Sequence, residues 1–70
     1  MDNLIVIESG KVKSTKGSNI TDCINEAIVM SSNLGIPILV DFNGYKISVT
    51  KDSNADRIAK VYMWSRNRNR

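Results

Sequence analysis

The sequence predicts an α+β protein with the element order ββαββα, or β-α-β-β-α if the first connection is a loop. Two helices are expected on one face of an antiparallel sheet. An Asn-Gly pair separates two apolar-alternating runs within residues 36–50, the strongest short-range signal for a β-hairpin. Two other segments carry apolar residues at helical spacing. Seventy residues suffice for one domain, which we place at 1–65, with a basic tail at 66–70 that is expected to fray.

The N-terminal residues 3–8 form a β-branched run that ends at a Ser-Gly pair, which is typical of a strand. A turn at this pair would form a hairpin with residues 11–15 and place Ile7 opposite Val12. The alternative leaves residues 9–18 as a long Lys-rich loop.

In the central hairpin, Asn43 and Gly44 suit the two turn positions that require positive φ. A two-residue loop places Phe42 opposite Tyr45, and opposed residues share a face of the sheet. The same register gives the apolar pairs Val40–Ile47 and Ile38–Val49.

The first helix is expected over about residues 19–33, because apolar residues recur there at helical spacing. Ser18 or Asn19 is suited to the N-cap. Gly35 suits the position after the last turn, and Pro37 cannot continue a helix.

The second helix is expected after Asp52, with Ser53 as N-cap and Asp56 in the place of the capping-box glutamate. Its core stripe is Ala55, Ile58, Ala59, Val61 and Tyr62. Each half of the chain then contains strand, X-Gly turn, strand, Lys-x-Ser-Asn and helix, so a ββα duplication and a chance match both remain open.

Composition excludes several classes of function. Cys23 is the only cysteine and there is no histidine, so an internal disulfide, a zinc site and Ser-His or Cys-His catalysis are not expected. We therefore predict neither an enzyme nor a cofactor, and interpret Cys23 as a buried small hydrophobe. No apolar run reaches the roughly 18 residues of a membrane span, and a cytoplasmic location is expected.

A chain this short usually needs additional stabilisation, and oligomerisation is the remaining route. In the predicted register Leu4, Val6 and Leu39 lie on the outer face of the sheet, where exposed apolar residues favour a partner. Trp64, beside the basic tail, is a further candidate. We expect these four residues to form a homo-oligomer interface.

The second helix carries the best candidate binding site. Arg57, Lys60 and Trp64 follow i, i+3, i+7 spacing, so two cations and an indole share one face. Such a face can bind a phosphate while a base stacks, although lysines and arginines usually solvate a surface. Asn43 and Tyr45, whose structural roles are the turn and the apolar face, are further candidate ligand contacts.

The net charge is +3, a mild excess that does not by itself identify a nucleic-acid-binding protein. Basic residues nevertheless cluster in two segments. The candidate phosphate contacts are Lys11, Lys13, Lys16, Arg66 and Arg68.

Residues 36–64 resemble a pattern found in small phage-encoded proteins, in which a Phe-Asn-Gly hairpin precedes an Asp-Ser helix start and a helix that ends in an aromatic residue. Some proteins of this build are immune-evasion sponges, oligomers that sequester cyclic nucleotides made by bacterial defence systems. The resemblance implies an intersubunit ligand site, with Arg57, Lys60 and Trp64 as its contacts, and a location in the host cytoplasm.

The leading hypothesis is therefore an oligomeric phage-type protein that sequesters an anionic nucleotide without catalysis. One alternative is a nucleic-acid-binding accessory protein that uses the basic helix and tail. A second is a protein-binding inhibitor of a host enzyme.

Overall fold

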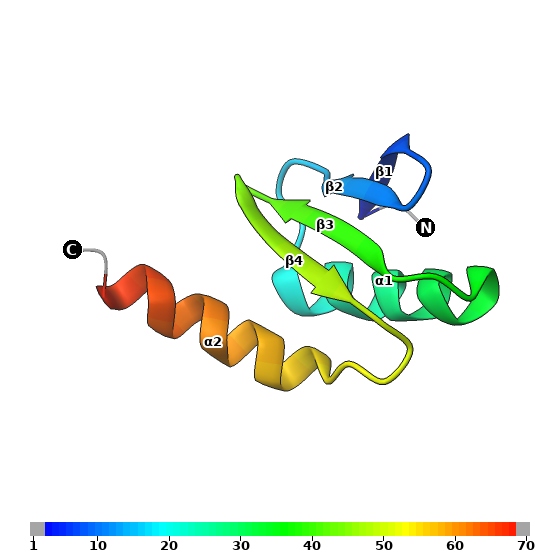
Figure 1. The fold of residues 1–70 in the computed structure, drawn as a ribbon. Coiled ribbons are helices and arrows are strands. Elements are labelled where there is room, and N and C mark those ends of the chain that lie inside the picture. The colour runs from blue at the N-terminus through cyan, green and yellow to red at the C-terminus, as the bar shows by residue number, and fades with distance from the viewer. Residues whose placement is uncertain (1–2, 69–70) are drawn as a thin grey trace.

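The computed structural model describes residues 3–68. Its elements are β1 (Leu4–Glu8), β2 (Lys11–Ser14), α1 (Ile20–Leu34), β3 (Ile38–Phe42), β4 (Tyr45–Val49) and α2 (Ala55–Arg68). The strands form one sheet in the order β1-β2-β3-β4, with α1 across one face and α2 beside β4 (Figure 1). The α+β class is confirmed, and the order is ββαββα because residues 11–14 form a strand.

The sheet is mixed, which corrects the expectation of an antiparallel one. Strands β2 and β3 are parallel, with Val12 opposite Val40, while β1–β2 and β3–β4 are antiparallel. The cause is α1, which joins β2 to β3 as a crossover and returns the chain to the same end of the sheet.

The central hairpin has the predicted register, including Phe42 opposite Tyr45. Asn43 and Gly44 have φ values of 53° and 86°, the two positive angles that a type I′ turn requires. The side chain of Asp41 accepts a hydrogen bond of 2.8 Å from the Gly44 N–H and supports the turn.

The predicted register of the first hairpin is wrong. Val6, rather than Ile7, lies opposite Val12, and a β-bulge separates Val6 from Glu8. The bulge adds one residue to β1 and so reverses the faces of the side chains that precede it.

The predicted outer-face cluster of Leu4, Val6 and Leu39 is therefore corrected. Leu4 and Val6 lie on the helix side of the sheet, where Leu4 packs against the core. Leu39 is half-buried and lies opposite Lys11 and Ser48 on the other face.

Helix α1 confirms the predicted limits to within one residue. Asn19 is its N-cap and accepts a hydrogen bond of 2.8 Å from the Thr21 N–H. Gly35 ends it in the left-handed conformation at φ 70° and donates its N–H to the Ser31 carbonyl, as at many helix C-termini.

Helix α2 has a different N-cap from the predicted one. Asn54, not Ser53, caps it, because the Asn54 side chain accepts from the Arg57 N–H at 3.1 Å. Ser53 Oγ instead accepts from the Thr50 N–H in the preceding turn. The helix continues to Arg68, and residues 69–70 of the predicted tail lie outside the described residues.

The core lies between the sheet and the two helices. Its buried hydrophobic residues are Val12, Ile20, Cys23, Ile24, Ala27, Ile38, Val40, Phe42, Ile47, Val49, Ala55 and Tyr62. Burial of each larger side chain contributes about 1.5–3 kcal/mol, so these residues supply most of the driving force for folding.

The positive φ of Gly44 in the hairpin turn predicts how a substitution there affects stability. Gly44→Ala should lower the free energy of unfolding by about 1–2 kcal/mol, because a Cβ disfavours the left-handed conformation, although the added Cβ would meet no atom within 4 Å beyond its two chain neighbours. Urea unfolding followed by circular dichroism measures the change. Ser48→Ala, on the exposed face of β4, is the control, and equal midpoints for the two variants would contradict the turn assignment.

Candidate binding groove between β4 and α2

A groove of about 320 Å³ runs between the edge strand β4 and the facing side of α2. Four consecutive strand residues and three helix residues line it: Tyr45, Lys46, Ile47, Ser48, Arg57, Ile58 and Val61. It exists because β4 has a neighbouring strand on one side only, while α2 returns along its other side.

Aromatic packing holds α2 in this position. The Tyr62 ring meets Phe42 edge-on at a centroid distance of 5.2 Å and Tyr45 at 5.1 Å. Tyr62 is buried, so α2 is fixed against the turn end of the hairpin. Such aromatic pairs contribute about 0.5–1.5 kcal/mol each beyond their burial.

The groove is cationic. Lys46 and Arg57 enter its lining from opposite walls, and none of the described residues that line it carries a carboxylate. Ile47, Ile58 and Val61 make the rest largely apolar. An apolar groove with two cations suits an anion that also bears a flat apolar group.

The groove brings together two of the predicted ligand contacts, Tyr45 and Arg57. It leaves out Lys60 and Trp64, which are exposed on α2. Trp64, 60% exposed, follows Val61 by three positions, so it lies about one turn further along the same side of the helix.

Asn43 belongs to a different hollow, of about 230 Å³, at the turn end of the outer sheet face. Lys13 and Asp41 also line it, and these two residues are opposite each other across the β2–β3 pair. Asn43 is exposed at the tip of the hairpin and does not line the groove that contains Tyr45 and Arg57, so its role as a ligand contact stays a prediction.

The predicted phosphate contacts lie on β2, in the connection before α1 and in the last turn of α2. Lys11 pairs with Glu8 at 3.1 Å, and Lys13 lies opposite Asp41. Lys16 is exposed in the connection before α1. Arg66 and Arg68 lie in the last turn of α2, and their side chains are outside the described part of the molecule.

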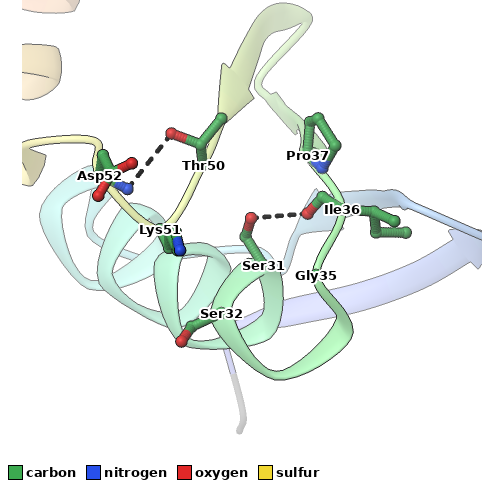
Figure 2. A pocket seen from close by; sticks show the side chains of 8 residues that line it. All are labelled: Ser31, Ser32, Gly35, Ile36, Pro37, Thr50, Lys51 and Asp52. Atoms are coloured by element: carbon green, nitrogen blue, oxygen red, sulfur yellow. Dashed lines mark hydrogen bonds between the residues drawn. The ribbon is translucent and has the colours of Figure 1, made fainter.

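A second hollow of about 320 Å³ lies where the C-terminal end of α1 meets the connection after β4 (Figure 2). Ser31 Oγ donates to the Ile36 carbonyl at 2.6 Å, and the Asp52 N–H donates to Thr50 Oγ1 at 3.3 Å. The negative end of the α1 dipole and the Asp52 carboxylate oppose anion binding here, despite Lys51. This hollow is the poorer candidate for a phosphate ligand.

Cys23 is buried, as predicted, and its Sγ lies 3.5 Å from the Asn3 carbonyl oxygen as a hydrogen-bond donor. Burial, with a smaller contribution from nearby Glu26 and Asp22, raises the pKa of the thiol above its ordinary value of 9.0. A protonated, inaccessible thiol is a poor nucleophile, so Cys23 has a packing role.

Sequence reasoning missed Lys46 and the apolar wall of the groove. A signal was available, because the predicted hairpin makes β4 adjacent in sequence to α2, and sequential elements usually pack together. What the sequence does not show is which side of α2 faces the strand.

Comparisons with known proteins add no assignment: no family model, curated protein or solved structure matches the chain. Within residues 3–68 no group of three or more potential metal ligands occurs. In the same range no helix has the length and apolar character needed to cross a membrane.

The raised pKa of Cys23 predicts a pH dependence. The folded state holds the thiol proton more tightly than the unfolded state, so this stabilisation is complete below the unfolded pKa and is lost as the pH rises through the folded pKa. The stability difference between the wild type and Cys23→Ala should therefore shrink above the ordinary value of 9.0. Urea unfolding of both proteins over a pH series measures it. A difference that stays constant to high pH would show that the thiol does not titrate in this way.

Proposed function

We propose that the protein is a non-catalytic binding protein that sequesters an anionic nucleotide in the groove between β4 and α2. The observation that carries the proposal is the convergence of Arg57, Lys46 and Tyr45 on one groove without a carboxylate in its lining. The guanidinium and ammonium groups are donors for phosphate oxygens, and charge-assisted bonds of this kind are the stronger ones.

The apolar walls supply the second part of the recognition. Ile58 and Val61 from α2 and Ile47 from β4 provide a surface for a nucleobase, and the exposed part of Tyr45 offers a ring for stacking. A volume of about 320 Å³ is at the small end of ligand sites, so it suits one nucleotide unit. A longer ligand, such as a cyclic dinucleotide, would extend along α2 toward Lys60 and Trp64.

The groove is formed within one chain, which departs from the intersubunit site that the phage-sponge resemblance implies. Sequestration by this site requires no second copy. The affinity of the groove for its ligand would depend on how firmly the packing of Tyr62 holds β4 and α2 in place before binding.

A second function, nucleic-acid binding, is favoured by the continuity of α2 to Arg68. Arg57, Val61 and Trp64 follow i, i+4, i+7 spacing, so they fall on one side of the helix. A helix with this pattern would contact phosphates and stack an unpaired base. Such binding should weaken steeply with salt, since it releases counterions.

Isothermal titration calorimetry tests the first function with AMP, cyclic di-AMP and cyclic ADP-ribose as probes. We expect saturable binding of at least one probe, weakened about tenfold or more by Arg57→Ala, because a hydrogen bond to a charged group contributes about 1.5–3 kcal/mol. Lys51→Ala removes an exposed cation outside the groove and serves as the charge-matched control, which should bind as the wild type does.

Failure of all three probes to bind, or equal affinities for Arg57→Ala and Lys51→Ala, would overturn nucleotide sequestration in this groove. Titration of a fluorescent single-stranded oligonucleotide at several salt concentrations tests the second function. A steep salt slope that decreases in Arg57→Ala and in Lys60→Ala would favour it, whereas no measurable binding would exclude it.

A further inference from the structure

Strand β1 exposes three consecutive apolar residues at an edge of the sheet. Ile5, Val6 and Ile7 are 52%, 64% and 55% exposed. The strand contains neither lysine nor proline, and its one charged residue, Glu8, already pairs with Lys11 at 3.1 Å. An apolar edge of this kind is usually covered by a partner.

The two edges of the sheet are treated differently. At the opposite edge, α2 lies beside β4, and Lys46 is exposed on that strand. Helical cover and an edge lysine are both devices that prevent strand addition. Of these two devices β1 has neither, so it is the edge at which another strand can pair.

The hydrogen-bond pattern between β1 and β2 determines which backbone groups of β1 face the open edge of the sheet. The Thr15 N–H donates to the Asn3 carbonyl at 3.0 Å, which makes Asn3 and Thr15 a hydrogen-bonded pair in the antiparallel ladder. Because such pairs alternate along a strand, Asn3 and Ile5 direct their backbone groups toward β2. The backbone N–H and C=O groups of Leu4 and Val6 therefore point away from β2, to the open edge of the sheet.

We propose that β1 pairs with β1 of a second copy of this chain, antiparallel, about a two-fold axis at Ile5. Leu4 of each copy then lies opposite Val6 of the other, and these two pairs exchange four backbone hydrogen bonds. The Ile5 side chains meet on the outer face. The result is a continuous eight-stranded sheet.

A second copy fits this edge better than an unrelated strand, because β1 is self-complementary. Its regular part, Leu4–Val6, is apolar on both faces, and the antiparallel register pairs apolar residues only. The bulge between Val6 and Glu8 lies outside the four hydrogen bonds. Because the same strand of both copies forms the interface about a two-fold axis, the assembly closes as a dimer instead of extending as a filament.

Helix α1 adds to the same interface. Glu26 accepts a hydrogen bond from the Asn3 side chain, so this flank of α1 borders β1. Val29, three positions further along, is 49% exposed. In the two-fold arrangement both α1 flanks lie on the helix side of the joined sheet, where Val6 and Val29 increase the apolar area that becomes buried.

Sedimentation equilibrium over a wide concentration range tests the proposal on the full chain. The wild type should have the mass of two chains, and Ile5→Lys should have the mass of one, because two ammonium groups would face each other at the axis. Ile5 is exposed in the single chain, so the variant should keep the circular dichroism spectrum of the wild type. Val61→Lys, at an exposed apolar position on α2, is the matched control and should remain dimeric.

A cysteine at the axis tests the register. Ile5→Cys in a Cys23→Ala background should form a disulfide-linked dimer on mild oxidation, whereas Val61→Cys in that background should not. A monomeric wild type, a dimeric Ile5→Lys, or no faster cross-linking at position 5 than at position 61 would each overturn the proposal. Nucleotide binding at the distant β4 groove should be the same in Ile5→Lys and the wild type, so the two proposals fail independently.

Discussion

The packing of Tyr62 against Phe42 and Tyr45 is the contact on which the arrangement of the second half of the chain depends. It joins α2 to the turn end of the β3–β4 hairpin through two edge-on ring contacts. It anchors the outer part of α2, where Val61 and Met63 are about half or more exposed, while α2 also packs against α1. The groove that we assign to ligand binding is the space left between these two elements, so the same contact positions both of its walls.

The two ends of the sheet then have separate roles. At β4, the helix protects the edge and creates a cationic, partly apolar groove around Arg57 and Lys46. At β1, the edge is apolar and uncovered, and its backbone pattern suits a second copy. Because the two edges lie at opposite ends of a four-stranded sheet, dimerisation would leave both grooves of the dimer accessible.

The sequence was most informative where two independent signals coincide. Asn43-Gly44 and the flanking alternation select one register, and that register is the observed one. At β1 the signals conflict: the Ser-Gly turn pairs Glu8 with Lys11, whereas the core requires Val12 to lie on the buried face beside Val40. A bulge accommodates both, and its position depends on tertiary packing that local sequence does not encode. The binding groove depends on tertiary packing in the same way. Tyr45 and Arg57 can be selected from the sequence as candidate ligand contacts, but Lys46 becomes a candidate only when the orientation of α2 is known.

Hydrogen exchange of Tyr62→Leu, measured by mass spectrometry on peptides from α1 and α2, tests the central role of the aromatic contact. Leucine keeps an apolar side chain at this position but removes the ring contacts with Phe42 and Tyr45. We expect faster exchange throughout α2, protection of α1 close to that of the wild type, and loss of ligand binding in the groove. Wild-type protection of α2 in this variant would contradict this expectation.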